Sequence, residues 1–122
     1  RQRVAIARTL AVKPQIVLMD EPFGALDVQT RLGMQNLINE LWEQIEGTIL
    51  FVTHDIAEAV YLADRIHILS AGPGRIVDEV EIDLPLHRTE DIKNTKRFRE
   101  LETLVLEKIR REASGGNVRI TT

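Results

Sequence analysis

The sequence predicts an α/β fold with parallel strands, flanking helices, an edge hairpin and a C-terminal helix. Short apolar runs at residues 16–19, 48–53 and 65–70 predict three buried strands, with helical patterns between them. Strands that alternate with helices favour parallel pairing, with the helices on the faces of the sheet. The length of 122 residues and the hydrophobic content of 43% suit one small globular unit.

Local signals place the elements between these strands. Residues 28–46 carry an apolar stripe that is typical of a helix. Asp55, with Glu58 three residues later, predicts a second helix that begins with a capping box. The sequence AGPG at 71–74 and the alternation over 75–82 predict a hairpin at a sheet edge.

The two ends of the chain have patterns of their own. Residues 1–12 are already helical in pattern, without an initiating Met or a cap, so we expect the chain to be cut from something longer. Residues 91–113 predict a C-terminal helix with one apolar stripe. We therefore expect a core at 1–84, a linker and helix at 85–112, and a flexible tail at 113–122. The stripe of the C-terminal helix consists of Phe98, Leu101, Val105 and Ile109.

Composition excludes several classes of protein. Cysteine is absent, which removes disulfides and thiolate metal sites. No apolar run approaches the roughly 20 residues that span a bilayer, and no signal peptide opens the chain. Residues 1–85 carry 13 acidic and 7 basic side chains, whereas 86–122 carry 6 and 9. Because no aromatic residues interleave with this modest basic excess, it predicts a solvated helix and no nucleic-acid partner.

Polar side chains follow two of the predicted strands. Asp20 and Glu21 end the first, and His54 ends the second, so parallel pairing would place all three at one edge of the sheet. A carboxylate beside a dry strand needs a cationic or hydrogen-bonding partner, and a magnesium ion would supply one. The alternative is that the acids cap the following helix or pair with an arginine. The residues alone leave these two interpretations equal.

The spacing of three motifs decides between them. Residues 16–21 (IVLMDE), 24–27 (GALD) and 51–55 (FVTHD) resemble the Walker B, D-loop and H-loop motifs of ABC transporter ATP-binding subunits, which are P-loop NTPases. The first ten residues, RQRVAIARTL, are similar to the helix that follows the LSGGQ-type signature of this family.

The resemblance implies a role for four residues. Asp20 would hold magnesium, usually through water, and Glu21 would orient or deprotonate the water that attacks ATP. His54 would contact the γ-phosphate, and Asp27 would lie where two subunits sandwich ATP head to tail. These roles suit phosphoryl transfer, which depends on charge neutralisation at phosphate oxygens and on an in-line water.

Other conspicuous residues are expected to be structural. His67 lies inside a strand, His87 in a proline-containing linker, and Trp42 on the apolar stripe of a helix. Pro22 and Gly24 are interpreted as backbone devices, with proline fixing the entry to the loop and glycine allowing a tight turn or a positive φ.

Several motifs of the family do not occur in this sequence. It contains no Walker A pattern GxxxxGK[ST], no Q-loop and no signature, and the AGPG segment at 71–74 is interpreted as a hairpin turn. The phosphate-binding lysine and backbone cradle would then lie elsewhere, so we do not expect this chain alone to hydrolyse ATP. In the family, the Walker A strand lies between the strands at 48–53 and 65–70. We therefore expect exposed strand edges, which lead the chain to pair with a copy, to rearrange its strands or to exist within a larger protein.

Residues 78–112 are similar to the C-terminal end of importer ATPases of the nitrate, sulfonate and taurine group. This resemblance implies a bacterial cytoplasmic ATPase that forms a homodimer on the inner face of the membrane. Two membrane-spanning permease subunits and an external substrate-binding protein would be its partners, and these would select the substrate.

Two alternatives remain open. ATPases of DNA repair and chromosome maintenance share the three motifs, but no coiled-coil heptads lead into the first helix and the continuation HDIAEAVYLADRIHILSAGPG is transporter-like. A non-catalytic regulatory domain is the other alternative, although retention of both Glu21 and His54 argues against it.

Overall fold

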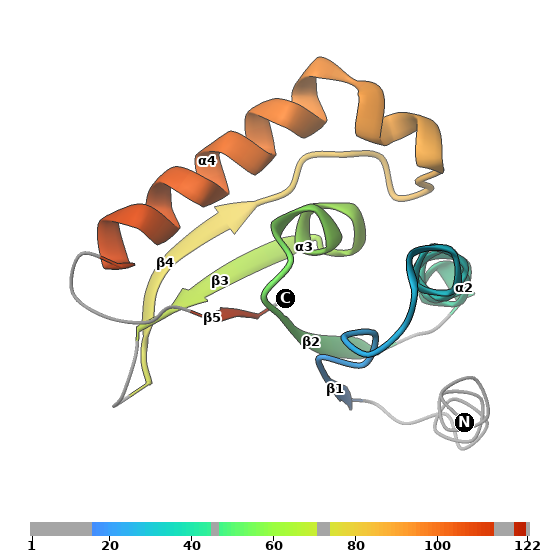
Figure 1. Cartoon of the computed structure of the whole chain (residues 1–122), viewed down its shortest axis with the longest axis horizontal. Coiled ribbons are helices and arrows are strands. Elements are labelled where there is room, and N and C mark those ends of the chain that lie inside the picture. The colour runs from blue at the N-terminus through green and yellow to red at the C-terminus, as the bar shows by residue number, and fades with distance from the viewer. Residues whose placement is uncertain (1–15, 45–46, 71–73, 114–118, 122) are drawn as a thin grey trace.

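The computed structural model describes residues 16–44, 47–70, 74–113 and 119–121. Over these residues a five-stranded sheet has the order β1-β2-β5-β3-β4, and α2, α3 and α4 lie on one of its faces (Figure 1). The elements are β1 (Ile16–Asp20), α2 (Val28–Gln44), β2 (Thr48–Thr53), α3 (Ile56–Leu62), β3 (Arg65–Leu69), β4 (Ile76–Glu81), the 3₁₀ helix η1 (Glu90–Asn94), α4 (Lys96–Ala113) and β5 (Arg119–Thr121). The helix expected at 1–12 and most of the AGPG turn lie outside the described residues.

The sheet confirms the predicted α/β class. Strands β1 and β2 are parallel, with Ile16 opposite Thr48 and Asp20 opposite Val52. Strands β3 and β4 form the expected antiparallel hairpin at the edge. The sheet as a whole is mixed, because β5 is antiparallel to both of its neighbours.

Two hydrophobic clusters attach the helices to the sheet. Alternation along β1 turns Val17 and Met19 toward the helices, while Ile16 and Leu18 are 70% and 66% exposed on the other face. The first cluster lies under α2 and consists of Val17, Met19, Phe23, Met34, Ile38 and Phe51. The second joins α3 and α4 to β3 and β4, and its largest fully buried members are Tyr61, Phe98, Ile66, Ile68, Leu101, Val60 and Val105.

The tail expected to be flexible contains a strand. Residues 119–121 form β5, which pairs with Val52 and Thr53 on one side and with 67–69 on the other. Strands β2 and β3 run in the same direction but are one strand apart, so each offers unpaired backbone groups to an extended segment between them. The prediction of a fraying tail is therefore wrong for 119–121.

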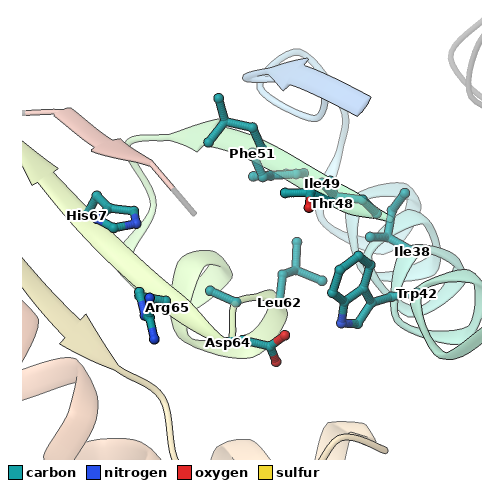
Figure 2. A pocket seen from close by; sticks show the side chains of 11 residues that line it. Ile38, Trp42, Thr48, Ile49, Phe51, Leu62, Asp64, Arg65 and His67 are labelled. Carbon is teal, nitrogen blue, oxygen red and sulfur yellow. The ribbon is translucent and has the colours of Figure 1, made fainter. Parts of the chain in front are cut away.

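Strand β5 fills only part of this space. Beyond Thr121, the amino-terminal halves of β2 and β3 border a largely apolar groove of about 310 Å³ (Figure 2). Trp42 was expected in the core, but it is half-buried and lines the groove together with Ile38, Leu62 and His67. The Nδ1 atom of His67 is buried and has no hydrogen-bond partner among the described residues.

The helix expected at 91–113 is divided at Thr95. The backbone of Thr95 is extended, with φ −81° and ψ 153°, so η1 ends before this residue and α4 begins after it. The Thr95 hydroxyl donates to the Ile92 carbonyl at 2.7 Å and accepts from the Phe98 amide at 3.3 Å. A threonine that bonds local backbone groups in this way is a strong helix start, and this local competition explains why one continuous helix does not form.

Candidate functional site

The carboxyl ends of β1 and β2 meet as the sequence predicted. Asp20 lies opposite Val52 at the end of the ladder, and the Glu21 amide donates to the Val52 carbonyl at 2.8 Å. Glu21 then turns with φ of 46°, a left-handed conformation that is unfavourable for any residue except glycine. Glu21 therefore lies beside the end of β2, and His54 is the first residue after that strand.

Glu21 and His54 are in direct contact. The Nε2 atom of His54 meets the Oε1 atom of Glu21, and the two side chains remain 59% and 41% exposed. They open on a pocket of about 200 Å³. Its walls are formed by Glu21, Phe23, Gly24, Arg31, Thr53, His54, Asp55 and Glu58. A carboxylate and an imidazole at an accessible pocket can accept and donate protons to a small molecule or a water.

Asp20, the last residue of β1, lies on the exposed face of the sheet, opposite the face that the helices cover. It alternates with the buried Val17 and Met19 and is exposed, so its carboxylate is available to solvent. The described residues contain no cluster of three His, Cys, Asp or Glu side chains suited to a metal ion. Magnesium is commonly held by one or two carboxylates, water and substrate phosphates, so an exposed Asp20 fits that ion without a preformed cage.

Asp27 has a clear local role. Its Oδ1 atom accepts a hydrogen bond from the Thr30 amide at 2.8 Å, and its carbonyl accepts from the Arg31 amide at 2.9 Å. Asp27 thereby caps α2 at its first residue, Val28. The hydrogen bonds from the backbone and hydroxyl of Thr30 hold the pKa of the Asp27 carboxyl below its usual value. Its side chain is exposed.

The loop between β1 and α2 turns at Gly24. Gly24 was expected to allow a tight turn or a positive φ, and it closes a turn, with its amide donating to the Glu21 carbonyl at 3.3 Å. The positive φ lies at Glu21.

A buried polar network lies beside the Glu21 and His54 pair, and sequence reasoning missed it. Glu58 accepts hydrogen bonds from Gln35 Nε2 at 2.7 Å and from the Thr53 hydroxyl at 2.8 Å. All three residues are at most 5% exposed. Glu58 was expected to return to the Asp55 amide in a capping box, but that amide donates to the Thr53 hydroxyl at 3.0 Å. The sequence signal that could have revealed this network was Gln35, a polar residue on the same face of α2 as the apolar Met34 and Ile38.

Arg31 connects the two loops of the site. Its guanidinium donates to the carbonyl oxygens of Phe23 and Gly24 at 3.2 and 3.4 Å, and it lies 3.7 Å from the Asp55 carboxylate. Asp55 in turn caps α3, accepting from the Glu58 amide at 3.1 Å. One arginine of α2 thus holds the loop after β1 against the turn after β2.

The two histidines expected to be structural lie outside this pocket. His87 contacts Glu43, with 2.7 Å between Nδ1 and Oε1, and His67 lies on β3 at the groove. Among the described residues, no helix combines the length and apolarity needed to cross a membrane.

The sheet brings Glu21, at the end of one strand, and His54, at the end of its parallel neighbour, to one pocket, while Asp20 lies outside the lining of that pocket. Comparison with known proteins confirms the class of protein named by the three motifs, because this chain is homologous to ATP-binding proteins of ABC transporters. No protein-family model matches the chain.

Three relatives illustrate this homology. An ABC transporter ATP-binding protein of Methanocaldococcus jannaschii is 58% identical over 91 residues, which is 73% of this chain and 34% of the relative. The aliphatic sulfonates import ATP-binding protein of Bacillus cereus is 50% identical over 106 residues, 87% and 41% of the two chains. The nitrate import ATP-binding protein of Synechocystis is 47% identical over 104 residues, 80% and 39%. The chain therefore spans about two fifths or less of these curated relatives.

Proposed function

We propose that this chain is the C-terminal part of a P-loop ATPase subunit that drives a bacterial importer of the nitrate and sulfonate type. The observation that carries the proposal is the contact between Glu21 and His54 at the ends of neighbouring parallel strands. Similarity to sulfonate and nitrate import proteins supports the importer assignment.

In the proposed reaction, a water attacks the γ-phosphorus of ATP, and the bond to the leaving ADP breaks. Glu21 orients this water and accepts its proton, while His54 contacts the γ-phosphate and, through its bond to Glu21, fixes the direction of the carboxylate. Asp20 would hold magnesium, usually through water. A magnesium ion held there would neutralise part of the charge on the phosphate oxygens.

The remaining parts of the proposal concern assembly. Asp27 would face a second ATPase subunit in a head-to-tail homodimer, and the dimer would lie on the cytoplasmic face of the cell membrane. Its partners would be two permease subunits and, through them, an external substrate-binding protein. Because the sequence holds no GxxxxGK[ST] segment, we infer that this chain alone neither binds ATP tightly nor hydrolyses it.

Replacement of Glu21 in a longer protein that contains both this chain and a GxxxxGK[ST] segment tests the proposal. We expect Glu21→Gln to retain ATP binding while turnover falls by about a hundredfold or more, because the amide cannot accept the proton from water. The matched control is Glu107→Gln, at an exposed position of α4. Turnover near that of the unmodified protein in Glu21→Gln would show that Glu21 does not activate the water.

A further inference from the structure

The turn that carries His54 is fixed from beneath by buried side chains. Thr53 precedes His54, and its hydroxyl both donates to Glu58 Oε1 at 2.8 Å and accepts from the Asp55 amide at 3.0 Å. A single hydroxyl therefore joins the residues on either side of His54 to one carboxylate. The His54 side chain itself is 59% exposed, so packing contributes little to its orientation.

The carboxylate of Glu58 is held in turn by the neighbouring helix. Its second oxygen accepts from Gln35 Nε2 at 2.7 Å, and the residue is 5% exposed. Each carboxylate oxygen has a donor, so the network has no unpaired oxygen that would favour another arrangement. The path from Gln35 through Glu58 to Thr53 links α2, α3 and the end of β2.

We propose that Glu58 and Thr53 are positioning residues, whose hydrogen bonds fix the turn at His54 so that its imidazole meets the Glu21 carboxylate. This inference rests on the proposed function of Glu21 and His54, and it adds two residues that act through His54. Loss of the Thr53 hydroxyl releases the Asp55 amide and one oxygen of Glu58 together. The turn then loses its fixed geometry, and the imidazole leaves its place against Glu21.

The first test uses the 122-residue chain and does not depend on ATP hydrolysis. The chain contains three histidines, so ¹⁵N-histidine labelling gives separate imidazole signals for His54, His67 and His87. We expect Thr53→Val, which keeps the shape but removes the hydroxyl, to shift the signals of His54 and leave the other two in place. Thr53→Ser keeps the hydroxyl and should restore the His54 signals.

A matched control and a second pair of variants accompany this measurement. Thr103→Val makes the same chemical change at an exposed position of α4 and should leave all three histidines unchanged. Glu58→Ala should shift His54 as Thr53→Val does. Glu58→Gln should not, because its oxygen can accept from Thr53 while the Gln35 amide turns to accept from the new amide. If Thr53→Val does not fold, Thr53→Ala removes the same hydroxyl with a smaller side chain.

The second test measures turnover in the longer protein described above. Because a misplaced catalytic group can cost a hundredfold in rate, we expect Thr53→Val to lower kcat by at least about tenfold with the KM for ATP little changed. Thr53→Ser should restore kcat, whereas a loss of stability alone would not be reversed so selectively. Unchanged His54 signals, or an unchanged kcat in a protein that Glu21→Gln inactivates, would overturn this inference. Activity retained in Glu21→Gln would instead overturn the proposed function, and the histidine signals would still decide the role of Thr53 and Glu58.

Discussion

Arg88 offers the sharpest test of what holds the fold together. It lies in the segment between β4 and η1, yet it is only 6% exposed, and its guanidinium is 3.7 Å from the Asp64 carboxylate. It donates at 2.7 to 3.3 Å to the backbone carbonyls of Val60, Tyr61, Ala63 and Pro85. Three of these carbonyls belong to the C-terminal end of α3, where no intrahelical donor is available.

The cost of replacing Arg88 follows from these contacts. Arg88→Met keeps most of the side-chain volume but leaves four carbonyls without their donor, at about 1–3 kcal/mol each. Burial of the guanidinium costs several kcal/mol, and this burial also lowers the pKa of Arg88. The cost is absent in Arg88→Met, which carries no charge. With this cost set against the four carbonyls, the net loss in the free energy of unfolding is about 3–5 kcal/mol.

Urea unfolding of the 122-residue chain, followed by far-UV circular dichroism, measures this loss. At this chain length, 3–5 kcal/mol corresponds to a fall in Tm of roughly 10–20 °C. Arg88→Lys should lose an intermediate amount, because one ammonium cannot reach all the carbonyls that the planar fork serves. Arg99→Met, at an exposed position of α4, is the matched control. A loss below about 1 kcal/mol in Arg88→Met would refute the reasoning, because surface substitutions alone reach about half of that.

Two further predictions concern acid stability and the sheet edge. Lys108 donates to Asp78 at 2.8 Å and lowers the pKa of that carboxyl below its ordinary 3.8, so the bond stabilises the fold above that pH and is lost as pH falls through the lowered pKa. We expect the double-mutant coupling between Asp78→Asn and Lys108→Met, measured by urea unfolding, to be present at pH 7 and to shrink in acid. We also expect deletion of 119–122 to expose the edges of β2 and β3 and to increase self-association in sedimentation velocity.

Each of these two predictions has an outcome that would contradict it. A coupling between Asp78 and Lys108 of equal size in acid and at pH 7 would mean that the ion pair does not contribute through its charge. A truncated chain that sediments as the 122-residue chain does would mean that β5 does not protect the sheet edges.

The parts of the fold that sequence predicted are those fixed by local signals. The strand β1, the Asp55 cap and the hairpin of β3 and β4 depend on residues close in sequence, and all three are present. The expectation that β1 is buried holds for only one of its faces, because Ile16 and Leu18 are exposed. The meeting of Glu21 and His54 was also foreseeable, because parallel pairing aligns the carboxyl ends of strands.

The parts that sequence missed depend on distant partners. Arg88 bonds carbonyls 25 to 28 residues away, and Gln35 bonds Glu58 across 23 residues. A single arginine in a linker or a glutamine on a helix carries no local pattern that would reveal such contacts. Strand β5 is three residues long, too short for a period-2 pattern, and it forms because β2 and β3 leave a place for it.

The position of β5 has a consequence for how this sequence behaves next to other polypeptide. Strand β5 lies between β2 and β3, which run in the same direction. It pairs with β2 over only two residue pairs and with β3 over only three. The groove beside Trp42 extends the position of β5 along both neighbours. A longer strand with apolar side chains could pair along the full length of β2 and β3 and would exclude β5 in doing so. Strand β5 is thus weakly held between β2 and β3. Its release would indicate that another strand has taken its position in the sheet.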